Sequence, residues 1–404
     1  MLKHILYVLF SVIVFACSNK EAKVLETQTY RVTMEVQDEK ELPFIMKVFS
    51  EDSLVINNAN EAIKVNEIEY KNDSVYIFMP VFESVLVAKI DENNDLKGYY
   101  LKPNLNRKVN FSATEGTERF ITVSDPRTNI SGAWETVFSP YSENDKYIAK
   151  GIFEQNGTKV EGTFRTETGD YRFLEGVIDE DTLKLSTFDG SHAFLFTALV
   201  TDTTMVGTFY SGNHWKELFV AKRNETFELA DADSLTYLKE GYDKLAFSFP
   251  DTEGKLVSLE DERFKNKVVV VQLMGSWCPN CLDESRFFVD YQKQHEDDPI
   301  EFIALAFEYA KTKELAMESI NRLKKSIGIK YPILLAQYGS SSKIEAHEKL
   351  PMLNHVLSYP TAVFIDKSGR VRKIHTGFNG PATKEKYLRF KSEFESYIEE
   401  LIEE

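Results

Sequence analysis

Residues 268–281 read VVVVQLMGSWCPNC, and this stretch decides the fold of the second half of the chain. Cys278 and Cys281 are separated by two residues and lie where a buried apolar strand gives way to a helix. Unpaired N–H groups and the dipole at a helix N-terminus favour the thiolate of Cys278, and Cys281 follows one turn later. Pro279 suits the first helical turn because its missing N–H is not needed there. The motif predicts a site of reversible dithiol–disulfide chemistry.

The number of cysteines separates this interpretation from a zinc site, of which a Cys-x-x-Cys pair is one half. The chain has three cysteines and seven histidines, and no histidine pair at ligand spacing lies near the motif. A structural zinc site needs about four ligands. A disulfide closing so short a loop adds little stability. We therefore expect Cys278 and Cys281 to form a redox-active disulfide, with no metal and no other cofactor.

The third cysteine, Cys17, ends a short apolar segment at the N-terminus. Residues 5–15 form an apolar stretch that is shorter than the about 20 residues of a membrane-spanning helix, and it fits an export signal. Ala16 is small, as the residue before a cleavage site usually is. A cysteine directly after the cut resembles a bacterial lipoprotein signal, so we expect a signal peptide over residues 1–16, lipidation of Cys17 and a tether over 17–28. The alternative is a plain signal peptide with an incidental cysteine.

Composition indicates a well-packed, acidic protein. The 404 residues suffice for two or three domains, and 43% hydrophobic and 13% aromatic residues supply ample core. The formal net charge is −16; without Lys3 of the signal, 47 of the 48 basic residues remain against 64 acidic ones, which makes −17. Such a charge argues against nucleic acid or an anionic lipid surface as a partner, because both would repel the protein.

Residues 29–225 alternate between apolar and polar positions in short segments separated by Asn, Asp and Gly. Segments such as 30–34 and 74–79 are rich in aromatic and β-branched residues, which predicts half-buried antiparallel strands. We expect an all-β domain here, a sandwich or a partly closed barrel. A polar connector over residues 226–243 follows.

Two features of this β-rich region bear on function. The sequence GAW at residues 132–134 resembles the opening of lipocalin barrels, but too few residues follow for a full eight-stranded barrel of that kind. His192 and His214 lie in turn-like surroundings, where histidines are usually solvated. We find no catalytic constellation in this half.

Residues 244–404 alternate between strand-like and helix-like segments, which indicates an α/β domain. We expect strands at residues 268–274, 300–307, 331–336, 361–365 and 371–375. We expect helices at residues 279–295, 314–326 and 384–402.

This order, the Trp-Cys-x-x-Cys motif and the sequence YPT at residues 359–361 look like a thioredoxin fold. The closer resemblance is to TlpA/ResA-type thiol-disulfide oxidoreductases of the bacterial cell envelope. They share the lead-in at residues 249–259 and extra strand–helix material in the middle of the domain. The resemblance covers about residues 244–404, and residues 29–225 look like the additional N-terminal domains of some exported members.

The resemblance implies a role for each matching residue. Cys278 would be the attacking thiolate and Cys281 the buried resolving thiol. The peptide bond before Pro360 would be cis. Trp277, Tyr359 and Pro360 would bind the substrate.

Glu284 matches an acidic residue that this family has near its active site. Three positions after Cys281, it lies on the same helix face, where a carboxylate can tune or deprotonate the resolving thiol. The alternative is an acid that only favours the helix N-terminus. The sequence departs from the family at Gln272, Met274 and Arg286, where asparagine, an aromatic residue and proline are frequent.

The expected function is therefore that of a lipid-anchored disulfide reductase of the bacterial cell envelope, facing the periplasm. The resemblance implies disulfide-containing exported proteins as substrates, a membrane thiol conduit of the CcdA or DsbD type as electron donor, and cytochrome c maturation as one pathway. One alternative is a disulfide oxidase or isomerase that uses the same couple. Another is a binding or redox-sensing lipoprotein whose β-rich half carries the main function.

Overall fold

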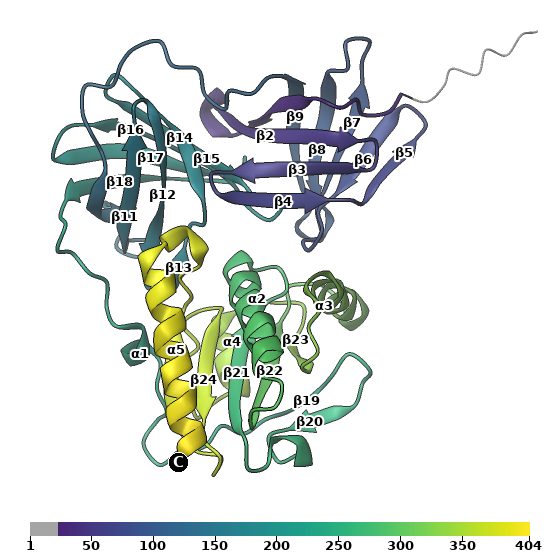
Figure 1. Ribbon diagram of the computed structural model, residues 1–404, viewed down its shortest axis with the longest axis vertical. Helices are drawn as coiled ribbons and strands as arrows, with labels where there is room; N and C mark the ends of the chain where they lie inside the picture. The colour runs from purple at the N-terminus through teal and green to yellow at the C-terminus, as the bar shows by residue number, and fades with distance from the viewer. Residues whose placement is uncertain (1–22) are drawn as a thin grey trace, which may run out of the picture.

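The computed structural model describes residues 23–404, so the predicted signal peptide and Cys17 lie outside the described residues. Figure 1 shows two β-sheet bodies in its upper half and a sheet flanked by helices in its lower half. The predicted order, an all-β region followed by an α/β domain, is confirmed. Within residues 23–404 no helix is both long and apolar enough to cross a membrane.

Residues 29–115 form one antiparallel sheet whose order is β4-β3-β2-β1-β9-β8-β7-β6-β5. Its strands are β1 (Thr29–Glu35), β2 (Glu41–Ser50), β3 (Ser53–Asn58), β4 (Glu61–Val65), β5 (Ile68–Lys71), β6 (Ser74–Phe78), β7 (Val85–Ile90), β8 (Leu96–Lys102) and β9 (Arg107–Glu115). Alternate residues are buried, as Tyr30, Val32 and Met34 are in β1, because one face of each strand packs on the core.

Residues 132–223 form a second antiparallel sheet, which closes on itself. Its strands are β10 (Gly132–Phe138), β11 (Tyr147–Asn156), β12 (Lys159–Thr166), β13 (Gly169–Asp170), β14 (Leu174–Asp179), β15 (Thr182–Phe188), β16 (Ala193–Val200), β17 (Thr204–Ser211) and β18 (Trp215–Arg223). The order is β11-β10-β18-β17-β16-β15-β14-β12-β13, and a further pairing of β11 with β12 joins the ends. All these strands except the short β13 therefore make a closed barrel.

The expectation that too few residues remain for a full barrel is wrong. The barrel strands are only 6 to 10 residues long and are joined by short turns, so the chain closes the barrel by residue 223. Trp134 of the lipocalin-like sequence is buried, and its indole N–H donates to the carbonyl of Ile130 at 2.8 Å. The interior is packed with aromatic rings, including Phe138, Phe164 and Phe196.

The α/β domain is built on the sheet β23-β22-β21-β24-β25. Its strands are β21 (Val268–Met274), β22 (Ile300–Phe307), β23 (Ile333–Gln337), β24 (Thr361–Ile365) and β25 (Val371–Thr376), preceded by the hairpin of β19 (Ser248–Pro250) and β20 (Leu256–Ser258). The helices are α1 (Ala232–Leu235) in the connector, then α2 (Pro279–Gln294), α3 (Lys313–Ile327), α4 (Lys343–Lys349) and α5 (Glu385–Glu403). The predicted strands and long helices agree closely with these bounds; α4 is too short to show a helical period.

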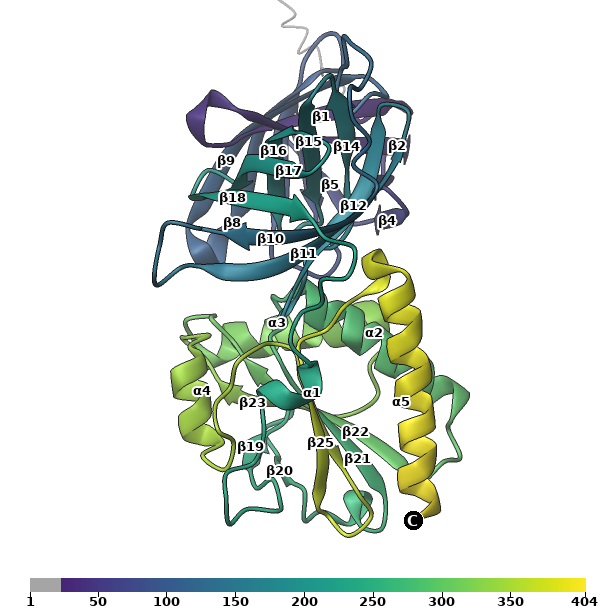
Figure 2. The same cartoon turned by 90° about the vertical axis from the view of Figure 1, so that its left-hand side faces the viewer.

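The sheet positions the functional motif at one end of this domain. β21 is buried at every position, and β22 and β23 run parallel to it, whereas β24 and β25 are antiparallel. Figure 2 shows α2 and α5 on one side of the sheet and α4 on the other. Phe287 of α2 and Phe394 of α5 pack edge to face with their ring centroids 4.9 Å apart. The start of α2 points toward the β-rich half.

The β-rich half packs directly on the α/β domain. Val81 and Phe82, from the connection between β6 and β7, are buried members of the apolar core of the α/β domain. Next to them, the hydroxyl of Ser326 in α3 donates to the carbonyl of Pro80 at 2.7 Å. The two halves therefore share buried apolar surface.

Candidate active site

Cys278 is the N-cap residue of α2, directly after the turn that follows β21. Its sulfur accepts a hydrogen bond from the backbone N–H of Cys281 at 3.2 Å. Pro279 is the first helical residue, where a missing N–H costs nothing. The sulfur therefore lies at the positive end of the helix dipole of α2. Cys278 is 7% exposed, so only a small part of it reaches solvent.

The peptide bond between Tyr359 and Pro360 is cis, which confirms the prediction made for Pro360. It lies against the motif, because Sγ of Cys278 is 3.5 Å from the carbonyl oxygen of Tyr359. The turn is fastened by the hydroxyl of Thr361, which donates to the carbonyl of Ser358 at 2.9 Å. A backbone carbonyl thus faces the sulfur on the side of β24.

Cys281 and Glu284 are both fully buried and are linked through Gln272 of β21. The amide nitrogen of Gln272 donates to a carboxyl oxygen of Glu284 at 2.8 Å and to the carbonyl of Cys281 at 3.3 Å. The other carboxyl oxygen of Glu284 has no hydrogen-bond partner within the described part of the chain. Burial raises the pKa of Glu284 to about 8, against the lowering effect of the Gln272 bond. Burial, and then the bond to and charge of Cys278, raise the pKa of the Cys281 thiol well above its usual value.

Trp277 and Tyr359 belong to an aromatic cluster beside the thiols. Their ring centroids lie 6.1 Å apart, edge to face, and Phe307 stacks on Tyr359 at 5.2 Å. The ring of Tyr309 lies 5.6 Å from that of Trp277. The indole N–H of Trp277 donates to the carbonyl of Phe307 at 3.0 Å, which holds the ring in place.

The structure brings six of the predicted site residues together: Trp277, Cys278, Cys281, Glu284, Tyr359 and Pro360. The seventh, Cys17, lies outside the described residues. Among residues 23–404, no group of three or more His, Cys, Asp or Glu side chains is arranged to hold a metal ion.

Comparison with known proteins places this half of the chain in a family. Residues 239–389 match the family model described as Redoxin. This part of the chain is a Redoxin domain. It is similar to the thiol-disulfide oxidoreductase ResA of Bacillus subtilis, with 26% identity over 140 residues, covering 35% of this chain and 69% of that protein. It is also similar to the thioredoxin-like protein YneN of the same species, with 26% identity over 140 residues, covering 35% of this chain and 73% of that protein.

Solved structures also resemble the chain in part. A thiol:disulfide interchange protein of the thioredoxin family from Chlorobium tepidum matches with a TM-score of 0.31 and 22% identity, covering 41% of this chain and 98% of that one. A thiol-disulfide oxidoreductase from Bacteroides fragilis matches with a TM-score of 0.29 and 17% identity, covering 37% of this chain and 99% of that one.

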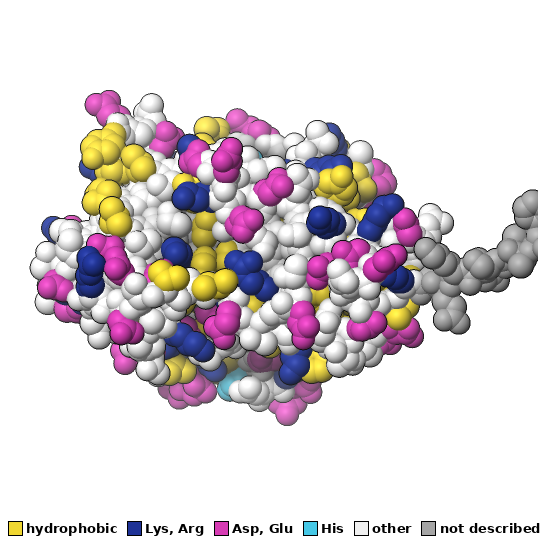
Figure 3. All heavy atoms as spheres, turned by 90° about the horizontal axis from the view of Figure 1, so that it is seen from above, with side chains coloured by type: hydrophobic (Ala, Val, Ile, Leu, Met, Phe, Trp, Pro, Cys, Tyr) yellow, Lys and Arg dark blue, Asp and Glu magenta, His cyan; other side chains and the backbone are white. Residues whose placement is uncertain are grey.

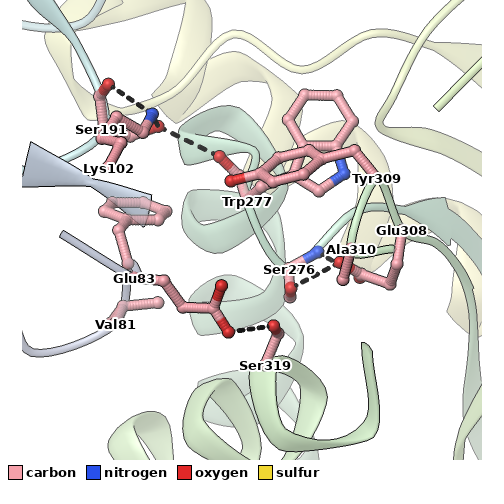
Figure 4. Close-up of a pocket in the computed structure, with 11 residues that line it drawn as sticks. Val81, Glu83, Lys102, Ser191, Ser276, Trp277, Glu308, Tyr309, Ala310 and Ser319 are labelled. Atoms are coloured by element: carbon pink, nitrogen blue, oxygen red, sulfur yellow. Dashed lines mark hydrogen bonds between the residues drawn. The ribbon is translucent and has the colours of Figure 1, made fainter. Parts of the chain in front are cut away.

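A second buried carboxyl, Glu308, holds the segment of the Redoxin domain that precedes Trp277 (Figure 4). Its two oxygens accept hydrogen bonds from the backbone N–H of Ser276 at 2.7 Å and from the Ser276 hydroxyl at 2.8 Å. Burial raises the pKa of Glu308 to about 7, against the lowering effect of both bonds. The sequence patterns did not predict a role for Glu308. Its signal is positional: both residues follow the carboxyl ends of the parallel strands β21 and β22, which meet at one edge of the sheet.

The β-rich half touches the Redoxin domain on both sides of Cys278. The hydroxyl of Ser191 donates to the carbonyl of Trp277 at 3.1 Å. The side-chain amide of Asn280 donates to the carbonyl of Asp170 at 3.1 Å. These contacts join residues more than 80 positions apart, so no local pattern in the sequence reveals them.

Arg172 is the central ionic contact between the two halves. Its guanidinium is buried and pairs with Glu61 of β4, with Asp283 of α2 and, at 3.3 Å, with Asp189. It also donates to the carbonyl of Pro279 at 3.0 Å. One side chain of the closed barrel therefore binds the first sheet and the first turn of the active-site helix at once.

Proposed function

We propose that this thiol-disulfide oxidoreductase reduces disulfides in exported proteins and that Cys278 and Cys281 are its redox couple. The observation that carries the proposal is the position of Cys278 as N-cap of α2, with Cys281 fully buried one turn later. Cys278, at 7% exposure, keeps a small part that a substrate sulfur can reach, whereas Cys281, at 0%, reacts only with its neighbour. The similarity to ResA supports the same chemistry.

The first step is attack by the Cys278 thiolate on one sulfur of the substrate disulfide. A mixed disulfide forms between Cys278 and that sulfur, and the other substrate sulfur leaves as a thiolate. In this proposal Trp277, Tyr359 and Pro360 contact the substrate chain beside its disulfide, because they surround Cys278.

The second step uses Cys281 and releases the substrate. The raised pKa of Cys281 keeps it a thiol until a base removes its proton. Glu284, with a pKa of about 8 and a free oxygen, takes that proton as general base. The Cys281 thiolate attacks the sulfur of Cys278, the second substrate sulfur leaves as a thiolate, and the enzyme is left with a Cys278–Cys281 disulfide. Two electrons have passed from the enzyme to the substrate.

The oxidised enzyme needs two electrons from an outside dithiol before it can act again. We propose a membrane thiol conduit of the CcdA or DsbD type as donor, and a lipid anchor on Cys17 that holds the protein on the periplasmic side of a bacterial membrane. The export-signal pattern over residues 1–16 supports this location. Cytochrome c maturation is one pathway with substrates of this kind.

The equilibrium reduction potential of the full-length protein, titrated against dithiothreitol, tests the direction of electron flow. A reductase is expected near or below about −270 mV, and a potential near about −120 mV would instead make the protein a disulfide oxidase. Cys278→Ser should abolish turnover, whereas Cys281→Ser should trap a mixed disulfide visible on a non-reducing gel. A chain with no reversible two-electron transition would refute the assignment of the couple.

A further inference from the structure

A cavity of about 280 Å³ lies between the two halves, beside the active-site motif. Lys102 and Arg107 of the β-rich half line it on one side, and Trp277 and Tyr309 of the Redoxin domain line it on the other. Trp277 directly precedes Cys278, so a molecule in this cavity lies next to the segment that carries the attacking thiol.

Two cationic side chains lie opposite each other where β8 ends and β9 begins. Lys102 and Arg107 are directly opposite partners in the pairing of these strands. Like charges in this position destabilise a sheet. Lys102 is 7% exposed, and its ammonium donates to the carbonyl of Ser191 at 2.9 Å and to its hydroxyl at 3.4 Å. Neither cation forms an ion pair with a carboxylate within residues 23–404.

The carboxyls near this pair are bound to other groups. Glu83 and Glu308 share the adjoining pocket with Lys102, but Glu83 accepts hydrogen bonds from Asn104 and Ser319, and Glu308 accepts them from Ser276. Asp189 is the carboxylate that acts on Lys102, but it is engaged by Arg172 at 3.3 Å and by His192 at 3.2 Å. Burial and then the charge of Arg107 lower the pKa of Lys102 to about 8.

His214, in the turn between β17 and β18, lines the same cavity. Partial removal from water, and then the charges of Arg107 and Lys102, lower its pKa to about 4. Two cations that line one cavity and form no ion pair within residues 23–404 favour the binding of an anion there.

The cavity is coupled to the motif by hydrogen bonds. Lys102 donates to Ser191, and the hydroxyl of Ser191 donates to the carbonyl of Trp277, as Figure 4 shows. Elsewhere the protein is acidic, with a formal net charge of −16, and acidic and basic side chains are interspersed on its β-rich end (Figure 3). The local pair of cations thus gives an acidic substrate an attractive position beside the active-site motif of an acidic protein.

We propose that this cavity is an anion subsite that binds a carboxylate of the disulfide substrate, with Arg107 and Lys102 as its ligands. The proposal rests on the proposed function and names its substrate class: a disulfide with a carboxylate close to it. That carboxylate comes from an acidic residue of a protein or from a small acidic disulfide. Arg107 forms the outer ligand because it is only partly buried, and its guanidinium can hold a carboxylate through two parallel hydrogen bonds.

Steady-state reduction of two disulfide peptides by the full-length protein tests the subsite. The peptides differ only in carrying glutamate or glutamine beside the disulfide. We expect KM to be about tenfold lower for the glutamate peptide, the size expected of a charged hydrogen bond. Arg107→Gln should remove this difference by raising KM for the glutamate peptide to the value for the glutamine peptide. Glutathione disulfide compared with its ethyl ester shows whether a small disulfide uses the same subsite.

Lys108→Gln is the matched control, because it removes one positive charge from the next residue of β9. Lys108 is exposed and lies over the ring of Tyr99, at 3.5 Å, away from the cavity. It should keep the preference for glutamate. Equal KM values for the two peptides in the unmodified protein would overturn the subsite, and so would an equal loss of the glutamate preference in both variants. Reduction of the glutamine peptide would still support the proposed function in either case.

Binding of a peptide that cannot be reduced tests the anion subsite separately from the proposed reductase function. A glutamate peptide whose cysteines are replaced by alanine should raise the pKa of His214 from about 4 when it binds, as followed by NMR. The shift should occur in the unmodified protein and in Lys108→Gln but be absent from Arg107→Gln. No shift in any of them would contradict carboxylate binding at this cavity, whatever the redox assays show.

Discussion

At the scale of single residues, the chemistry depends on a carboxyl buried beside a buried thiol. Glu284 has one oxygen held by Gln272 and one free, and its pKa is raised by burial to about 8. We predict that Glu284→Gln slows the release of the mixed disulfide about 100-fold, the usual contribution of a general base. Single-turnover kinetics with Cys278 already linked to a peptide measure this step. An unchanged rate, or a rate in the unmodified protein that does not rise as pH passes through about 8, would contradict the role.

The same carboxyl makes the stability of the fold depend on pH. Its pKa is about 8 in the fold against 4.5 as the ordinary value, so between these limits the folded state keeps a proton that the unfolded state loses. The free energy of unfolding must therefore fall as pH rises from about 4.5 to 8. We predict that Glu284→Gln is about as stable as the unmodified protein at pH 4 and more stable at pH 8. Urea unfolding at both values tests this; a variant less stable at pH 8 would contradict it.

At the scale of elements, the first turn of α2 is held by a side chain from the closed barrel. Arg172 pairs with Glu61, Asp189 and Asp283 while it is buried. We predict that Arg172→Met lowers the free energy of unfolding by about 3–5 kcal/mol, because it leaves buried carboxylates without a counter-charge. Thermal unfolding of the full-length protein gives the measurement.

Arg127→Met is the comparison for that variant. Arg127 pairs with Glu180 at 3.2 Å, but both side chains are largely exposed, at 66% and 46%. Exposed pairs contribute about 0–1 kcal/mol, so this variant should unfold close to the unmodified protein. If both variants lose a similar free energy of unfolding, burial of Arg172 does not determine how much its ion pairs stabilise the fold.

At the scale of the whole molecule, the β-rich half covers the segment that carries Cys278. Phe82 of that half is 6% exposed and packs in the apolar core of the α/β domain. We predict that Phe82→Ala costs about 3–5 kcal/mol of stability, as large-to-small core substitutions do, and speeds the reaction of Cys278 with a bulky maleimide. Phe49→Ala, at a position 50% exposed, should change neither quantity. If Phe82→Ala leaves the maleimide rate unaltered, this contact does not control access to the thiol.

Local patterns in the sequence determined the strands, the long helices and the Cys278–Cys281 pair, because each depends on periodicity or spacing within one or two turns of chain. The cis bond before Pro360 was expected from the resemblance to the thioredoxin fold. The closed barrel, the bond between Ser276 and Glu308, and the contacts of Arg172 with α2 were decided only by the tertiary structure. The tertiary structure alone also created the cavity that is lined by Lys102, Arg107 and Trp277. These features join segments that are far apart in the chain, and their partners are selected by packing and burial, which leave no local pattern in the sequence.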